Sequence, residues 1–359
     1  MKRMFLICLS VLLVLSFFAC GNQQQNTEQD TQANTDANTD ANTNANSDVQ
    51  PTDPATEPNQ PVDENPVSAE PVKIAALAGP TGVGLAYLMQ DMQDRYSVEI
   101  FTAPDQVTAK IINGEVDIAA VPINLASVLF AKTEGKVNVI AINTLGVLYI
   151  LENGETVGSI SDLTGKTIYA TGQGSTPEYV LNYLLAANGL TDSVNVEYIA
   201  DNTELIAKLA DGTISVAMLP EPHVSVALAQ GENVRVALNV NDLWNEKNET
   251  QLVQGVYIVR SEYLADHKAQ VDAFLKDAAD SANKVVTEED AAAVVVAQGI
   301  IGKEPIAKKA IPNCNITLIT GEEMKKTVSD MLRVLFDANP KSIGGAMPAD
   351  EFYYTADPS

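Results

Sequence analysis

Four short turns rich in glycine and proline carry the residues best placed to bind a ligand. Each turn follows an apolar run and opens a helix-like stretch; the four are Gly79-Pro80-Thr81-Gly82, Pro122-Ile123-Asn124, Thr171 to Pro177, and Leu219-Pro220-Glu221-Pro222. Such turns leave backbone N–H groups free and carry the positive end of a helix dipole. They can therefore bind an anion or a polar heteroatom without any Lys or Arg. Any one of them also fits an ordinary strand-to-helix turn, so the prediction depends on all four facing one cleft.

Residues for catalysis or metal binding are scarce in this chain. Its two histidines are His223, which follows Pro222 in the first turn of a helix and can reach a cleft, and His267, which fits a solvated helix surface. Ser–His–Asp chemistry needs a well-placed histidine, and no Cys/His cluster has the spacing of zinc ligands. The sequence therefore predicts no enzyme, no cofactor and no metal site.

Short apolar runs alternate with amphipathic stretches of helical length. The strand candidates are Val72 to Leu77, Val98 to Thr102, Asp117 to Val121, Val137 to Asn143, Gly146 to Leu151, Lys166 to Ala170, Val194 to Ile199, Ser215 to Leu219, Val234 to Leu238 and Val256 to Arg260. Alternation of this kind predicts an α/β fold with mostly parallel sheets covered on both faces.

An internal repeat indicates that one α/β unit occurs twice. Residues 109 to 122 and 207 to 220 align without a gap at an offset of 98, with five identities in fourteen positions. Each copy reads as a helix end, a glycine at the position after the helix, and a buried strand that ends in proline. Helix–glycine–strand is common in α/β proteins, but the identities favour duplication. Two such lobes create a cleft at the carboxyl ends of their strands, where ligands bind in open sheets.

Several segments together resemble a known family. They are Gly79 to Gly82, Gly114 to Ala119, Ser161 to Ile168, Gly172 to Thr176 and Leu219 to Pro222. They resemble the solute-binding lipoproteins of ABC importers, in the nitrate, sulfonate, taurine and thiamine-precursor group, over nearly everything from Val72 to the C-terminus. The best single marker is Asp162-Leu163-Thr164-Gly165-Lys166, since that pattern enters the second lobe just after the hinge in the family.

The resemblance implies a two-lobed type II periplasmic-binding-protein fold with two hinge crossings and a ligand cleft between the lobes. The first crossing is expected near Val157 to Gly165 and the return near Leu252 to Gly255. The first lobe is then residues 71–160 with 255–359, and the second lobe is residues 161–254. Closure of the hinge would trap the ligand, because the closed form makes contacts from both lobes.

The cleft-lining turns of the family imply a set of ligand-binding residues. They are Gly79, Pro80, Thr81, Gly82, Asn124, Thr144, Gly174, Ser175, Thr176, Glu221 and Gln254, with Asn143 as a further candidate. Glu221 can accept a hydrogen bond from an amine or a heterocycle, or simply favour the dipole of its helix. The aromatic residues Tyr149, Tyr169, Tyr179 and Trp244 can stack a planar ring, although most such residues belong to a core. A small organic solute with a heterocyclic or polar head is favoured, and its identity stays open.

The first twenty residues read as an export signal. Lys2 and Arg3 precede an apolar run from Phe5 to Phe18, which is too short to favour a spanning helix of ~20 residues. Ala19-Cys20-Gly21 after that run resembles the lipobox of bacterial lipoproteins, in which the cysteine is lipidated, although Phe17 departs from the usual leucine. Residues 1–19 are thus expected to be a signal peptide and Cys20 to carry the lipid, with an ordinary secretion signal as the alternative.

Residues 20–70 are expected to form a disordered acidic tether. Residues 21–70 contain no Lys, Arg or aromatic residue and carry ten acidic residues. Such a segment cannot bury enough apolar area to offset its ordering entropy. The tether would hold the folded part away from the membrane.

Charge and cysteine content narrow the partners. A formal charge of −25 argues against nucleic acid as a partner. Cys314 is the single cysteine of the expected folded part, so we expect no internal disulfide and interpret Cys314 as a buried, unreactive thiol. The family resemblance, together with the expected lipid at Cys20, implies a lipid-anchored monomer on the extracytoplasmic side of the cell membrane. The partners that the resemblance implies are a small-molecule ligand, an ABC permease and its ATPase. The alternatives are a non-transport surface or sensory lipoprotein and, more remotely, an enzyme related to the thiamine-pyrimidine synthases.

Overall fold

The computed structural model describes residues 70–355, and their strands form two sheets. The first sheet has the order β11-β4-β10-β3-β1-β2, with β1 (Val72–Leu77), β2 (Tyr96–Phe101), β3 (Ile118–Pro122), β4 (Val137–Leu145), β10 (Val253–Arg260) and β11 (Ile316–Ile319). The second has the order β7-β6-β8-β5-β9, with β5 (Leu148–Asn153), β6 (Thr167–Ala170), β7 (Asn195–Tyr198), β8 (Val216–Pro220) and β9 (Val234–Asn239). We call residues 70–145 with 253–355 the first lobe and residues 148–245 the second lobe. The expected signal peptide, Cys20 and residues 21–69 of the expected tether lie outside the described residues.

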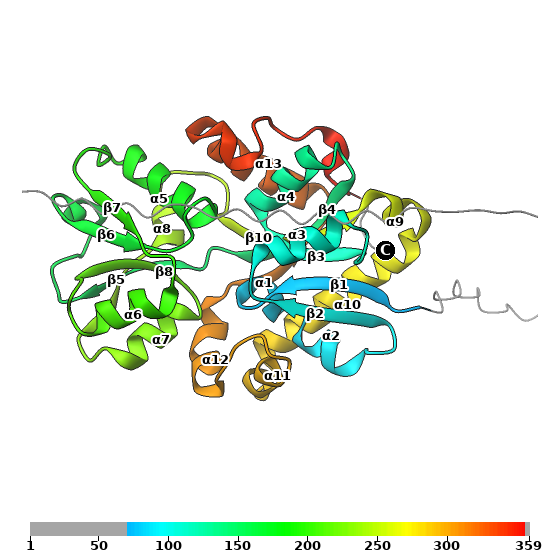
Figure 1. Ribbon diagram of the computed structural model, residues 1–359, viewed down its shortest axis with the longest axis horizontal. Helices are drawn as coiled ribbons and strands as arrows, with labels where there is room; N and C mark the ends of the chain where they lie inside the picture. Colours follow the sequence, from blue (N-terminus) through cyan, green and yellow to red (C-terminus); the bar gives the residue numbers. More distant parts are fainter. Residues whose placement is uncertain (1–69, 356–359) are drawn as a thin grey trace, which may run out of the picture. The chain divides into compact units, whose positions relative to one another are not determined.

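Helices surround both sheets (Figure 1). The second lobe contains α5 (Thr176–Ala187), α6 (Asn202–Ala210), α7 (His223–Gln230) and α8 (Val240–Asn245). The first lobe contains α1 (Pro80–Val83), α2 (Ala86–Asp91), α3 (Pro104–Ile112), α4 (Ile123–Lys132), α9 (Ser261–Asp266), α10 (Lys268–Thr287), α11 (Ala291–Ala297), α12 (Glu304–Ala310) and α13 (Gly321–Ala338). In the part of the chain that the structure covers, no helix combines the length and apolar character needed to cross a membrane.

Strand alternation explains why helices cover both faces of the second sheet. In β8, Val216 and Met218 belong to the same buried cluster as the apolar side of α5, while Ala217 and Leu219 pack with α6 and α7. Side chains along a strand point alternately to opposite faces, so two apolar sets need two helical layers. The helices in turn place the start of α5 and the start of α7 at the same edge of the sheet.

The predicted repeat is confirmed in the secondary structure. Helices α3 and α6 and strands β3 and β8 keep the offset of 98 residues at both their first and last residues. Gly114 and Gly212, which follow the helices, have φ values of 70° and 78°. Glycine adopts this left-handed conformation without the steric penalty that a Cβ atom brings. The two glycines therefore marked the helix ends in the sequence.

Two predictions about the sheets are wrong. The first crossing does not fall near Val157 to Gly165, because β5 already pairs with β8 and β9, so the chain changes sheet at residues 146–147. The sheets are also mixed rather than mostly parallel: β10 runs antiparallel to β3 and β4, and β5 runs antiparallel to β8 and β9. Strands β5 and β10 each follow directly from a crossing between the lobes. Each runs in the direction opposite to its two neighbours in the sheet. The return crossing ends at Val253, where β10 begins, close to the predicted Leu252.

Candidate functional site

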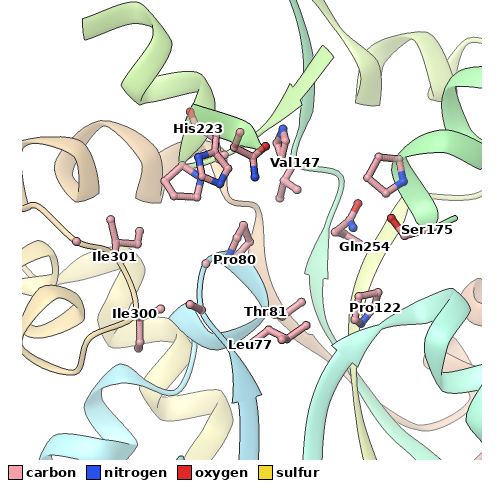
Figure 2. Close-up of a pocket in the computed structure, with 18 residues that line it drawn as sticks. Leu77, Pro80, Thr81, Pro122, Val147, Ser175, His223, Gln254, Ile300 and Ile301 are labelled. Atoms are coloured by element: carbon pink, nitrogen blue, oxygen red, sulfur yellow. The ribbon is translucent and has the colours of Figure 1, made fainter. Parts of the chain in front are cut away.

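A cavity of about 370 Å³ lies between the two lobes. The first lobe contributes to its lining Leu77, Ala78, Gly79, Pro80, Thr81, Pro122, Gln254, Ile300, Ile301 and Gly302. The second lobe contributes Ser175, Pro177, Asn202, Pro220, Glu221, Pro222 and His223, and Val147 comes from the crossing between the lobes. In Figure 2 the side chains of Pro80, His223, Gln254 and Ile301 lie around one space. The size and the mixture of many apolar and few polar groups suit a small organic molecule.

The sequence-based site residues divide into two groups in the structure. Gly79, Pro80, Thr81, Ser175, Glu221 and Gln254 line the cavity. Gly82, Asn124, Thr144, Gly174 and Thr176 are not part of its lining. Contact of the first group with a ligand stays a prediction, whereas the second group has structural contacts that explain its position.

Asn124 and Thr176 join the two lobes. The Thr176 hydroxyl donates a hydrogen bond of 2.9 Å to Asn124 Oδ1, and both residues are buried. Asn124 Nδ2 lies 3.5 Å from the carbonyl oxygen of Ser342. The bond therefore ties the first turn of α4 in the first lobe to the first turn of α5 in the second lobe, beside the cavity.

The turn before α1 is held by side chains on β4. Asn143 Nδ2 donates to the carbonyl oxygen of Thr81 at 3.2 Å, and the Thr144 hydroxyl lies 3.3 Å from the carbonyl oxygen of Pro80 and 3.0 Å from Asn143 Oδ1. A Cβ atom at Gly82 would lie 2.5 Å from the carbonyl oxygen of Leu77, so only glycine fits there. Asn143, Thr144 and Gly82 thus position Pro80 and Thr81 at the cavity wall.

Glu221 is a buried acid whose bonds are supplied by the protein. Its carboxylate accepts hydrogen bonds from the Ser225 N–H and hydroxyl, each at 3.1 Å, and from Asn313 Nδ2 at 3.4 Å. Burial raises the pKa of Glu221 above its usual value, although the Ser225 and Asn313 bonds act against it. Asn313 belongs to the first lobe, so Glu221 also contributes to the contact between lobes. Its hydrogen-bonding role is therefore largely internal.

The surroundings of His223 favour its neutral form. Burial lowers the pKa of His223 below its usual value, which favours the uncharged imidazole at neutral pH. A histidine that acts as a catalytic base is held by a hydrogen bond from its second nitrogen to a carboxylate or carbonyl. Among residues 70–355, His223 has no such bond, and no three His, Cys, Asp or Glu side chains are grouped to hold a metal ion.

Several parts of the lining were not predicted from the sequence, among them Leu77 and Ala78 at the end of β1. Val147 lies in the crossing, which the sequence placed elsewhere, and Ile300 to Gly302 follow α11 rather than a strand. Asn202 is the first residue of α6 and occupies the position that Pro104 takes in the other copy of the repeat. The aromatic candidates Tyr149, Tyr169, Tyr179 and Trp244 do not line the cavity.

Comparisons with known proteins support the two-lobed fold. A family model described as NMT1/THI5 like matches residues 97–292, which is more than half of the chain. No curated protein sequence matches. The crystal structure of an ABC transporter from Parabacteroides distasonis superposes with a TM-score of 0.69 at 24% identity, covering 79% of this chain and 98% of that one.

Two further crystal structures carry more specific descriptions. The periplasmic aliphatic sulphonate binding protein SsuA from Escherichia coli has a TM-score of 0.64 and 19% identity, covering 77% of this chain and 91% of its own. The periplasmic nitrate-binding protein NrtA from Synechocystis PCC 6803 has a TM-score of 0.54 and 13% identity, covering 78% and 85%. At these identities the likeness shows the fold alone, and it confirms the predicted two-lobed periplasmic-binding-protein fold.

Proposed function

Because the chain belongs to the NMT1/THI5-like family, we propose that it is the extracytoplasmic substrate-binding component of an ABC importer. It captures a small organic solute in the cavity between its lobes and delivers it to the membrane permease. The observation that carries the proposal is the shared lining: residues of both lobes form one cavity of about 370 Å³. A molecule held there makes contacts that an open cleft cannot make, which couples binding to closure.

The features of the cavity favour binding over catalysis. Within the described part of the chain, His223 has no hydrogen-bonded carboxylate to orient it as a base, and the Glu221 carboxylate already accepts hydrogen bonds from Ser225 and Asn313. A transport protein needs only to hold its ligand and release it, which the hydrogen bond between Asn124 and Thr176 can regulate. The proposal therefore gives the chain no reaction of its own.

Binding and import are tested in two steps. A panel of small solutes should contain at least one that raises the melting temperature of the purified chain, because a ligand that binds only the folded state adds about 2.7 kcal/mol at 100 times its Kd. A strain that lacks the gene should then lose uptake of that solute. Normal uptake in that strain would favour a sensory or other surface protein, and a panel without any stabilising solute would argue against a binding function.

Thr176→Val should weaken ligand binding by shifting the protein toward an open cleft. The substitution keeps the side-chain shape but leaves Asn124 Oδ1 without its donor in the closed form, at a cost of about 1–3 kcal/mol. Opening exposes that oxygen to water, so the cost falls on the closed form alone. We expect about a tenfold rise in the apparent Kd in thermal-shift titrations and a larger radius of gyration in solution scattering.

Thr191→Val is the matched control, since Thr191 is exposed and lies away from the cavity. It should leave both the apparent Kd and the radius of gyration unchanged. If Thr176→Val behaves like this control, the contact between Asn124 and Thr176 has no part in closure.

We also propose that Cys20 anchors the protein to the membrane through a lipid. The proposal rests on the sequence Ala19-Cys20-Gly21 after a short apolar run. Cys20→Ala should move the protein from the membrane fraction to the soluble extracytoplasmic fraction, and Cys314→Ala should leave it at the membrane. Continued membrane retention of Cys20→Ala, measured by immunoblotting of fractions, would indicate a spanning segment instead.

A further inference from the structure

Two side-chain amides at the cavity lack partners for their oxygens. Asn202, at the start of α6 in the second lobe, and Gln254, on β10 in the first lobe, both line the cavity. The oxygen of each amide is buried and has no hydrogen-bond partner within residues 70–355. Burial of an unpaired amide is costly, and most buried polar side-chain atoms in native proteins are paired. The terminal amide torsion is soft, so either group can turn to meet a molecule in the cavity.

The lining offers an anion no positive charge. Its ionisable side chains are Glu221 and His223, and it contains no Lys or Arg. Burial lowers the pKa of His223, which keeps that ring uncharged, and any ionised fraction of Glu221 would repel an anion. Transferring an unpaired charge out of water is among the most expensive steps in binding. Coulombic terms therefore disfavour a sulfonate or nitrate here.

Backbone donors are also reduced at this site. Five lining residues are prolines, which have no N–H group: Pro80, Pro122, Pro177, Pro220 and Pro222. Pro80 and Pro177 occupy the first turns of α1 and α5, and Pro222 is the cap of α7. In α7, the Ser225 N–H already donates to Glu221. The helix starts that could hold an oxyanion through backbone N–H groups therefore have fewer of them than the sequence pattern suggested.

We propose that the ligand is an uncharged polar molecule that carries both hydrogen-bond donors and acceptors, and that the amides of Asn202 and Gln254 bind it from opposite lobes. This inference rests on the proposed binding function. The proline rings with Ile300 and Ile301 form the apolar wall against which the body of the ligand packs. The ligand proposed here is uncharged, whereas two of the structural neighbours are described as binding the anions sulphonate and nitrate. An amide, a lactam or an amino-substituted heterocycle has the required chemistry, because an amide side chain can both donate to it and accept from it.

The test compares solutes that differ in charge and hardly in shape. The full chain is titrated by thermal shift with matched pairs, namely nicotinamide with nicotinate and ethanesulfonamide with ethanesulfonate, within a wider panel built in the same way and including nitrate. Neutral members should stabilise the protein and their anionic counterparts should not. Asn202→Ala and Gln254→Ala should each raise the Kd of a neutral ligand about tenfold, as expected for one lost hydrogen bond to a neutral group.

Gln251→Ala is the matched control, because Gln251 is exposed and three residues from Gln254. It should leave the Kd unchanged. Stronger stabilisation by a sulfonate, a carboxylate or nitrate would overturn the inference about charge while the proposed binding function stands. Neutral binding that survives both amide substitutions would overturn the assignment of Asn202 and Gln254. A panel in which no solute stabilises the protein would count against the proposed function itself.

Discussion

Gly255→Ala is expected to lower ligand affinity about a hundredfold although residue 255 does not line the cavity. Gly255 lies on β10, opposite Pro122 of β3 and Thr144 of β4. A Cβ atom there would lie 2.6 Å from Asn143 Oδ1 and 2.6 Å from Thr81 Cγ2, distances at which the neighbours must move. Thr81 lines the cavity, and Asn143 holds the turn that carries it. A hundredfold loss corresponds to about 2.8 kcal/mol of binding free energy, which we expect from displacing Thr81 together with the turn that carries it.

The same substitution should also lower the free energy of unfolding by about 1–3 kcal/mol, the usual cost of overpacking a buried site. Thermal-shift titration with a ligand from the panel and chemical denaturation separate the two effects. Gly158→Ala is the control, because the nearest atom to its Cβ would be Asp162 Oδ2 at 3.8 Å, an ordinary contact. If Gly255→Ala binds and unfolds like Gly158→Ala, the support of the Thr81 turn by β4 and β10 is not required for binding.

The duplicated unit was predictable because its signals are local. Gly114 and Gly212 mark helix ends through their backbone conformation, and the apolar runs after them are strands in either lobe. The crossing was not predictable in this way. The run from Gly146 to Leu151 reads as a strand whichever sheet it joins, and its pairing with β8 and β9 depends on residues about 70 to 90 positions away.

The site shows the same division between local and distant information. The turn residues Gly79, Pro80, Thr81 and Ser175 lie at the cavity because each follows a strand, as the sequence indicated. The sequence could not tell that Asn124 and Thr176 face each other across the lobes, since that depends on how the cleft closes. Nor could it assign Ile300 to Gly302, which reach the cavity from a loop after α11. The strand pattern in the sequence locates the turns. Whether a turn residue lines the cavity or joins the two lobes depends on contacts between the lobes.

Because the return crossing connects the two lobes, we expect one substitution beside it to lower both stability and ligand affinity. Trp244 lies in the last turn of α8, just before that crossing, and is fully buried. Its indole N–H donates to the carbonyl oxygen of Thr250 at 2.8 Å, and its ring lies 5.1 Å from that of Tyr183 on α5. The Tyr183 hydroxyl in turn donates to Asn248 Oδ1. Trp244 thus fixes the crossing segment to the helix whose first turn carries Ser175 and Thr176.

We therefore expect Trp244→Ala to lower the free energy of unfolding by about 3–5 kcal/mol, the range for removing a large buried aromatic side chain. The chain has one tryptophan, so unfolding is followed by circular dichroism in guanidinium chloride rather than by fluorescence. Trp244→Phe keeps a ring against Tyr183 and loses the bond to Thr250, and should cost about 1–2 kcal/mol. Ligand affinity should fall in the alanine variant as well, because a loosened crossing allows α5 to withdraw Thr176 from Asn124. A loss of less than about 1 kcal/mol for Trp244→Ala would mean that the crossing is held by other contacts, and the hinge would have to be sought at residues 146–147 alone.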